Sequence, residues 1–326
     1  MFSLDQYRAA HESAIVVDRS SQGKIALAGA DRASFLHALL TNDIARLTKG
    51  IGAYSAYLTP QGRMISDMRV IETGERIVLD VEGVVAGPLA DRFEKLIFSE
   101  DVRVENVTAD LAEIGVHGPS AASAIQRASG IAVARLEHQY DNLVESGITL
   151  VRDDALGVSG FDMYVDRSRA EGLRAKLVEA GVTTADEETV EVLRIEAGRP
   201  RFGVDMDTDT IPLEAGIEDR AISFTKGCYV GQEVIIRVLH RGHGRISRKL
   251  VGLVLAAGST PSRGDSILAA GGQRVGEITS VAFSPFVGAP IALGYVHRDH
   301  IAPGTELNVG LGPTSVPPGP TSRARH

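Results

Sequence analysis

A single cysteine in 326 residues sets the strongest limit on how this chain can fold. One thiol cannot form an internal disulfide, so buried apolar surface must supply the tertiary structure. The composition, 44% hydrophobic and 23% charged, is that of a globular protein. A chain of this length exceeds one ordinary core, and we expect two or three domains.

Charge and apolar patterning exclude several classes of protein. The chain has 34 basic and 42 acidic residues, a net charge of −8, which argues against a general nucleic-acid binder. No stretch approaches the ~18 consecutive apolar residues of a membrane span, and we expect no membrane association. The first residues show no basic segment followed by an apolar core, so no secretory signal is expected. With the lone thiol, these features favour a cytoplasmic protein.

The cysteine lies in the sequence K-G-C-Y-V-G-Q-E at residues 226–233. Gly227 and Gly231 bracket Cys228, and glycine permits the positive φ and close backbone approach of a shaped loop. If a helix begins after Gly231, its N-terminus and the Lys226 ammonium would both lower the pKa of the thiol. This favours a reactive or ligand-donating thiol over a small buried apolar residue, the usual role of a free cysteine. Four residues would shape the loop: Gly227, Gly231, Gln232 and Glu233.

A well-defined helix is expected to end near Glu196. Thr184 and Glu187 have the spacing of a capping box, and Gly198 would terminate the helix. A carboxylate in the last turn opposes the helix dipole at a cost of roughly 0.3–1 kcal/mol. Glu196 therefore either forms an ion pair with a neighbouring arginine (Arg194, Arg199 or Arg201) or binds a planar N–H/NH₂ edge, as carboxylates bind guanidinium groups.

Asp67 lies in a predicted hairpin, in which residues 54–58 and 64–71 pair across a turn at 59–62. Aspartate is depleted in strands, and alternation places Arg63, Asp67 and Arg69 on one face. A cross-strand ion pair and a ligand contact are both compatible with this position.

Residues 234–264 contain no acid and six lysine or arginine side chains, five of them between residues 237 and 249. A solvated basic face is the usual explanation, and docking of an anionic ligand tail by Arg237 and Arg241 is the alternative. His240, His243 and Cys228 are poorly spaced for a metal, so we expect no metal site. Short strands after residue 249 predict a small barrel, and residues 312–326 predict a disordered tail.

The K-G-C-Y-V-G-Q-E sequence closely resembles the signature of YgfZ-type folate-binding proteins. This group is implicated in iron–sulfur cluster maintenance. Its members are similar in fold to the aminomethyltransferase, or T-protein, of the glycine cleavage system. L-R-I-E-A-G at residues 193–198 is similar to the superfamily's L-R-x-E-x-G motif, whose glutamate holds the pterin ring. The resemblance thus implies that Glu196 binds the pterin and that Asp67 faces the folate. The expected ligand is tetrahydrofolate or a one-carbon derivative of it.

The resemblance also implies an α+β fold arranged as a three-part cloverleaf. Residues 1–48 and 140–243 would form a first domain that carries the cysteine loop, residues 49–139 an inserted second domain, and residues 244–311 a C-terminal β-barrel.

Three functions are compatible with the sequence. The first is a tetrahydrofolate-binding accessory factor for assembly or repair of iron–sulfur proteins, with Cys228 and Lys226 as its working groups and iron–sulfur client or assembly proteins as partners. One thiol cannot hold a cluster alone, so any cluster contact would be transient or shared. The second is a folate-dependent one-carbon transferase like the T-protein, and whether the chain is an enzyme stays open. The third is a binding module in which folate is structural.

Overall fold

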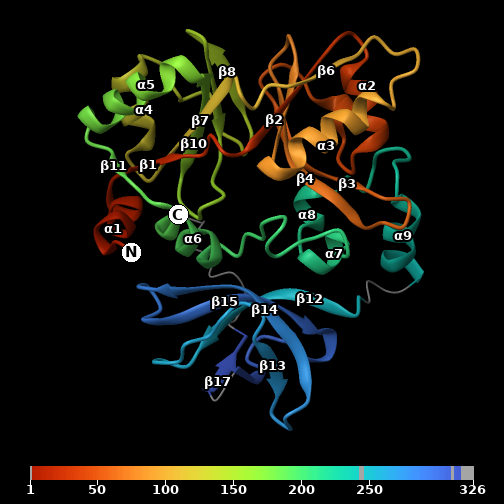
Figure 1. Cartoon of the computed structure of the whole chain (residues 1–326), viewed down its shortest axis with the longest axis vertical. Helices are drawn as coiled ribbons and strands as arrows, with labels where there is room; N and C mark the ends of the chain where they lie inside the picture. The colour runs from red at the N-terminus through yellow and green to blue at the C-terminus, as the bar shows by residue number, and fades with distance from the viewer. Residues whose placement is uncertain (1, 242–245, 310–311, 317–326) are drawn as a thin grey trace.

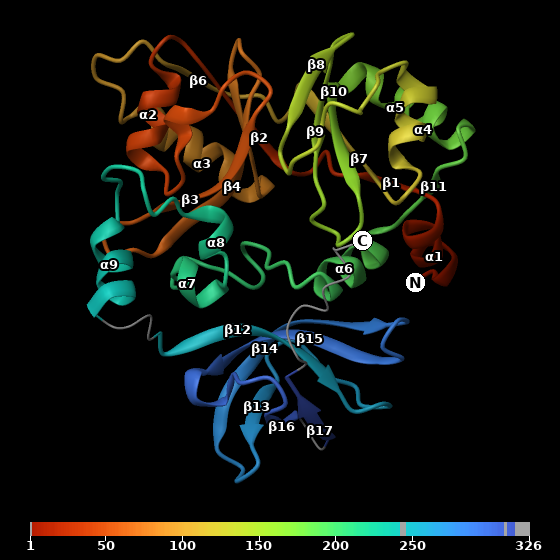
Figure 2. The ribbon, with the colours of Figure 1, turned by 180° about the vertical axis from the view of Figure 1, so that it is seen from behind.

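The computed structural model describes residues 2–241, 246–309 and 312–316, and it consists of three parts arranged as a cloverleaf (Figures 1 and 2). A six-stranded sheet and a five-stranded sheet lie side by side, and a closed six-stranded barrel lies beneath both. This arrangement confirms the predicted α+β class with a C-terminal barrel. Within the described residues, no helix combines the length and apolar character needed to cross a membrane.

The six-stranded sheet has the order β11-β1-β7-β10-β9-β8. Its strands are β1 (Ile15–Asp18), β7 (Leu111–His117), β8 (Asn142–Glu145), β9 (Ile148–Arg152), β10 (Gly160–Asp166) and β11 (Thr183–Thr184). Helices α4 (Ala121–Ser129) and α5 (Arg167–Glu179) cover one face and close an aliphatic core around Ile114, Leu150 and Met163. Helix α1 (Leu4–Glu12) packs at the lower end of this sheet, next to β1 and β11.

The five-stranded sheet has the order β3-β4-β5-β2-β6. Its strands are β2 (Gly23–Ala28), β3 (Gly52–Leu58), β4 (Met64–Glu72), β5 (Ile77–Val81) and β6 (Arg103–Asn106). Helices α2 (Arg32–Leu39) and α3 (Gly83–Glu94) cover it, with a 3₁₀ turn η1 (Ile44–Arg46) following α2. Phe35, Tyr57 and Phe93 lie at the centre of the core between them. The predicted hairpin of residues 54–58 and 64–71 is confirmed as β3 and β4.

A buried charge cluster joins the two sheets. The Arg69 guanidinium on β4 donates to Asp153 and Glu113, each at 2.6 Å, and also to Asp80 and Asp162. Three of these carboxylates belong to the six-stranded sheet or the loop after β9, so one side chain spans the junction. Removing one partner of such a buried pair commonly costs about 3–5 kcal/mol, so the cluster fixes the relative position of the sheets.

Short helices connect the sheets to the barrel. They are α6 (Glu187–Glu196), α7 (Pro212–Ala215), α8 (Glu218–Ala221), α9 (Gln232–Ile236) and a π-helical turn η2 (Arg237–Arg241). The barrel strands are β12 (Arg248–Leu255), β13 (Ser266–Ala269), β14 (Arg274–Ser284), β15 (Ala289–His297), β16 (Glu306–Val309) and β17 (Gly312–Ser315), with a 3₁₀ turn η3 (Arg298–His300). Both views place α6 and α7 directly above the barrel (Figures 1 and 2).

Strand pairing departs from the domain boundaries that we expected from the sequence. Strand β2, expected with residues 1–48 in the first domain, pairs with β5 and β6 in the five-stranded sheet. Strand β7, expected in the inserted segment 49–139, pairs with β1 and β10 in the six-stranded sheet. The chain therefore crosses between the sheets at residues 19–22 and 107–110. Alternation within one strand carries no information about such long-range pairing.

Two other expectations are wrong in detail. Residues 312–315, expected in a disordered tail, form β17, which pairs with β12 and β16 and closes the barrel; residues 317–326 lie outside the described residues. The cap of α6 is Asp186, whose side chain accepts a hydrogen bond from the Thr189 amide at 2.9 Å. Thr184, the predicted cap, lies in β11 because the parallel pairing with Val16 extends this segment.

Candidate functional site

Asp67 lies on the face of β4 that points toward the six-stranded sheet, two residues before Arg69. Its carboxylate accepts a hydrogen bond of 2.6 Å from the Tyr54 hydroxyl on β3. Burial raises the pKa of Asp67 to about 6, against the lowering effect of the Tyr54 hydrogen bond. The predicted cross-strand ion pair is not formed, because Arg63 binds Asp209 and Arg69 binds the buried charge cluster.

Two arginines lie near Tyr54. The Arg220 guanidinium, from α8, stacks 4.8 Å from the centre of the Tyr54 ring. Arg199, just after α6, interacts electrostatically with Arg220, Tyr140, Asp153 and Tyr54, and its buried Nε has no hydrogen-bond partner among the described residues. Burial and the Arg220 charge lower the pKa of Arg199.

We refer to Tyr54, Asp67, Tyr140, Arg199 and Arg220 as the Asp67 cluster. It combines two aromatic rings, a carboxyl group with a raised pKa, and two guanidinium groups that form no ion pair within the described chain. Both guanidinium groups are partly exposed, and a guanidinium without a close ion-pair partner can bind an anionic ligand. Sequence analysis identified Asp67 alone. Arg199 follows the end of α6 and Arg220 lies in the four-residue helix α8, and neither segment is long enough for a periodic pattern to indicate the direction of its side chains.

Glu196 ends α6 and lies at the junction of α1, α6 and the barrel. Its carboxylate accepts hydrogen bonds from the Tyr7 hydroxyl, at 2.9 and 3.1 Å, and from Ser284 on β14 at 2.5 Å. The arginine ion pair considered for Glu196 is absent among the described residues. Arg194 binds Glu191 and Asp205 instead, and Arg201 binds Glu82. The folate contact predicted for Glu196 stays a prediction, and it requires a ligand edge to join or replace these hydroxyl donors.

Arg194, next to Glu196 in the L-R-I-E-A-G motif, fastens the barrel to α6. Its guanidinium donates to Asp205 and to the Ser280 hydroxyl, each at 2.7 Å. The second oxygen of Asp205 accepts from Ser280 and from Thr279 on β14. Residues of α6, of the loop that contains Asp205 and of β14 therefore meet in one buried polar network.

Lys226 supports the loop rather than the thiol. Its Nζ donates to the carbonyl oxygens of His37, Leu40 and Asn42 at 2.5, 2.7 and 3.1 Å. These carbonyls follow the end of α2, where unpaired acceptors favour a cation. Burial lowers the pKa of Lys226 to about 8, whereas the three carbonyl oxygens stabilise its charged form. Its predicted catalytic role beside Cys228 stays a prediction.

Cys228 is exposed, so the alternative of a buried apolar residue is excluded. Helix α9 begins at Gln232, directly after Gly231, which is its N-cap at φ +85°. A helix at this position was the condition for its N-terminus to lower the pKa of the thiol. A Cβ at Gly231 would lie 2.5 Å from the Thr59 carbonyl oxygen, so only glycine fits between the loop and the β3–β4 turn. Gly227 adopts no positive φ and has open space around it.

The thiol loop and the Asp67 cluster lie at different positions along the β3–β4 hairpin. The loop packs on the β3–β4 turn, and Asp67 lies five residues beyond Gly62, roughly 16 Å along an extended strand. Both views place α9 at the outer edge of the molecule and α8 near its centre (Figures 1 and 2).

The basic run is only partly described. Arg248 and Lys249 pair with Glu214 and Glu218, which links β12 to α7 and α8. Arg237 is exposed at the end of α9, and the side chains of His240 and Arg241 and all of residues 242–245 lie outside the described residues. The predicted contact of Arg237 and Arg241 with a ligand tail stays a prediction. In the described part of the chain, no group of three or more His, Cys, Asp or Glu side chains is arranged to hold a metal ion.

Comparison with known proteins agrees with this geometry. The profile of the GCVT N-terminal domain matches residues 2–226, and that of the glycine cleavage T-protein C-terminal barrel domain matches residues 248–320. The chain belongs to the glycine cleavage T-protein family.

Among its relatives is the aminomethyltransferase of Rubrobacter xylanophilus, 30% identical over 294 residues that cover 89% of this chain and 78% of that protein. The aminomethyltransferase of Saccharopolyspora erythraea is 28% identical over 325 residues, 96% of this chain and 86% of that protein. The crystal structure of the glycine cleavage system aminomethyltransferase T from Bartonella henselae has the same fold, with a TM-score of 0.90 at 24% identity; the match covers 99% of this chain and 90% of that one.

Proposed function

We propose that this protein binds a tetrahydrofolate-type ligand at the Asp67 cluster and catalyses folate-dependent one-carbon transfer of the aminomethyl type. The observation that carries the proposal is the pair of guanidinium groups that form no close ion pair within the described residues, near a carboxyl group whose pKa is raised to about 6. Membership of the T-protein family and relatives that are aminomethyltransferases support it.

The donor set of the site fits a reduced folate. Arg199 and Arg220 supply cations for the carboxylates of the folate. The Arg199 Nε–H, which has no hydrogen-bond partner among the described residues, can donate to one of these carboxylates. Tyr54 and Tyr140 offer aromatic faces for a planar ring. Glu196, an acceptor on the same connecting segment as Arg199, suits the N–H/NH₂ edge of a pterin. Arg237 and Arg241 would contribute only at the end of an anionic tail, because Arg237 lies on the outer helix α9.

A bound reduced folate supplies the nitrogen atoms that carry a one-carbon unit. Asp67 contributes the proton chemistry: near neutral pH a carboxyl group with a pKa of about 6 is mostly ionised and can accept a proton on its oxygen. The Tyr54 hydroxyl, whose own pKa is raised by burial and by the Asp67 charge, holds that carboxylate in place. Arg220 stacks on Tyr54 and fixes the orientation of the ring.

Calorimetric titration with tetrahydrofolate tests the binding proposal. Arg199→Gln should weaken binding about 10- to 150-fold, because a charged hydrogen-bond donor is lost. Arg103→Gln, on an exposed residue of β6, serves as the matched control and should bind as the wild type does. Equal affinities in all three proteins would remove the Asp67 cluster from consideration as the folate site.

A second candidate function is favoured by the exposed thiol. Cys228 is accessible in a loop held by Gly231 and Lys226, in the sequence that resembles YgfZ-type proteins. The protein would then act as a folate-binding accessory factor for iron–sulfur proteins, sharing a ligand position with a client or assembly protein. Deletion of the gene, followed by complementation with wild type and Cys228→Ser, tests it: iron–sulfur enzyme activities restored equally by both would exclude a role for the thiol.

A further inference from the structure

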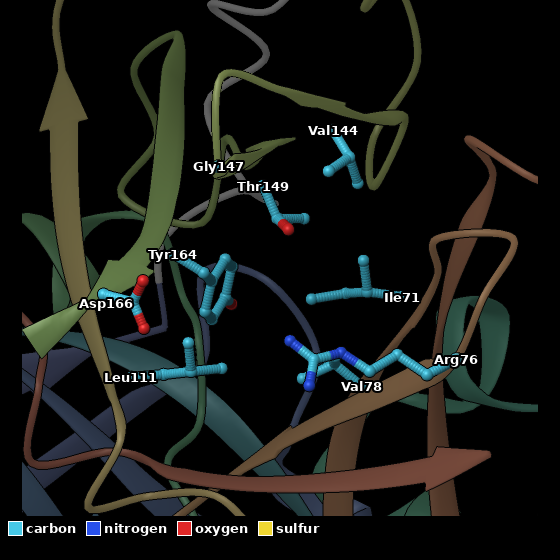
Figure 3. Close-up of a pocket in the computed structure, with 9 residues that line it drawn as sticks. All are labelled: Ile71, Arg76, Val78, Leu111, Val144, Gly147, Thr149, Tyr164 and Asp166. Atoms are coloured by element: carbon cyan, nitrogen blue, oxygen red, sulfur yellow. The ribbon is translucent and has the colours of Figure 1, made fainter.

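A cavity of about 160 Å³ lies between the two sheets, and none of the residues that line it belongs to the Asp67 cluster or the thiol loop (Figure 3). Residues of β4, β5, β7, β8, β9 and β10 line it, together with the turns that precede β5 and β9. Its apolar lining consists of the buried Ile71 and Val78, the partly exposed Leu111 and the exposed Val144. The ring of Tyr164 also lines it, and the Tyr164 hydroxyl donates to Asp80 in the buried charge cluster.

Two opposite charges enter this cavity from different sheets. Arg76, in the turn before β5, extends its guanidinium from one side, and Asp166, at the end of β10, extends its carboxylate from the other (Figure 3). Within the described chain, neither side chain forms an ion pair or a side-chain hydrogen bond, with each other or with a third group. The cavity therefore separates a cation from an anion that do not neutralise each other directly.

Asp166 is exposed and is the residue before α5, and its side chain makes no capping hydrogen bond to the first turn of the helix. The carboxylate points into the cavity instead, as Figure 3 shows. Because the carboxylate makes no capping hydrogen bond, its oxygen atoms can accept hydrogen bonds from a ligand in the cavity.

We infer that this cavity binds a small zwitterion with an aliphatic body, of the class of α-amino acids with short aliphatic side chains. The ligand carboxylate would face Arg76, its ammonium group would face Asp166, and its aliphatic part would contact the four apolar residues. A simple anion would face the Asp166 carboxylate, and a simple cation would face the Arg76 guanidinium, so a ligand with one charge meets repulsion that a zwitterion avoids. The inference concerns a second site and does not depend on the proposed folate site.

A matched set of probes tests the inference on the full chain. Valine carries both charges, 3-methylbutanoate carries only the carboxylate, and isobutylamine carries only the ammonium group, on the same branched carbon skeleton. Methyl NMR spectra recorded with millimolar valine should show saturable shifts at Ile71, Val78, Leu111 and Val144, with the barrel residue Ile267 unaffected. The two probes with a single charge should bind at least about tenfold more weakly.

Two variants assign the charges. Arg76→Gln and Asp166→Asn should each weaken valine binding about 10- to 150-fold, and Arg103→Gln should leave it unchanged. An unshifted Ile267 methyl resonance verifies that each variant is folded. The inference is overturned if valine gives no saturable shift, if either single-charge probe binds as tightly as valine, or if both variants keep the wild-type affinity.

Discussion

The Asp67 cluster and the thiol loop obtain their properties in different ways. At the Asp67 cluster the decisive factor is burial, which raises the pKa of Asp67 to about 6. The buried Nε of Arg199 also has no hydrogen-bond partner among the described residues. At the thiol loop, Cys228 is exposed, and backbone geometry does the work through the tight contact of Gly231 with Thr59. The first arrangement suits a small molecule that is enclosed, and the second suits a partner that approaches from solvent.

The largest expected effect is on transfer chemistry at the Asp67 cluster. Asp67→Asn should reduce one-carbon transfer about 10²- to 10⁴-fold, since the group that accepts the proton is lost. Tetrahydrofolate affinity should change little, because the asparagine oxygen still accepts the Tyr54 hydrogen bond. Transfer assays and calorimetry on the same preparations measure the two quantities. A variant with full transfer activity would show that Asp67 does not act in the reaction.

Asp67→Asn should also change the pH dependence of stability. The pKa of Asp67 is raised in the folded protein from its usual value of 3.8 to about 6, so the folded state binds the proton more tightly. The stabilisation that this provides is complete below pH 4 and is lost as the pH rises through 6. Above pH 6 the variant should therefore exceed the wild type in free energy of unfolding by about 1–3 kcal/mol. Urea denaturation at pH 4 and pH 8 provides the check, and parallel curves for the two proteins would contradict the raised pKa.

Glu196→Gln should weaken tetrahydrofolate binding by about 5- to 150-fold. The amide would place an N–H donor against the donors of the pterin edge, whereas the hydrogen bonds from Tyr7 and Ser284 can still reach its oxygen. Glu171→Gln, on the exposed face of α5, is the control and should bind normally. Calorimetry that gives the same affinity for both variants would restrict Glu196 to joining α1, α6 and the barrel.

At the thiol loop the expected effect is one of backbone geometry. Gly231→Ala should lower the free energy of unfolding by about 1–3 kcal/mol, because φ is +85° and the added Cβ meets the Thr59 carbonyl oxygen. Gly227→Ala, in the same loop with open space around it, should change stability by less than about 0.5 kcal/mol. Equal losses from both variants in urea denaturation would mean that the loop is not positioned by Gly231.

Local patterns in the sequence predicted much of the fold but little of its long-range pairing. The β3–β4 hairpin, helix α6 and most barrel strands follow from alternation, periodicity and turn residues. Helix α5 was missed because only Leu173 and Leu177 are buried in a mostly charged segment, which leaves a weak apolar stripe. Strands β2 and β7 were assigned to the wrong neighbours because pairing between distant segments is decided by the assembled cores, not by any one strand.

The candidate site was predictable only where a residue type conflicts with its local structure. Asp67 within a strand and Glu196 at a helix C-terminus both stood out, as their local preferences are unfavourable. Arg199 and Arg220 did not stand out in the sequence, because an arginine in a short connecting segment is common. Their surroundings depend on how distant parts of the chain pack together. Lys226 was predicted to lower the pKa of the Cys228 thiol, which stays a prediction; its ammonium binds carbonyl oxygens at the C-terminal end of α2.

The separation of the two regions is tested most directly by calorimetric titration of tetrahydrofolate into the wild type, Cys228→Ser and Arg199→Gln. Cysteine and serine differ by one atom, and the thiol is exposed, so Cys228→Ser should bind with the wild-type affinity. Arg199→Gln should bind about 10- to 150-fold more weakly. Loss of binding in Cys228→Ser with retention in Arg199→Gln would contradict the assignment of the ligand to the Asp67 cluster and place it at the thiol loop.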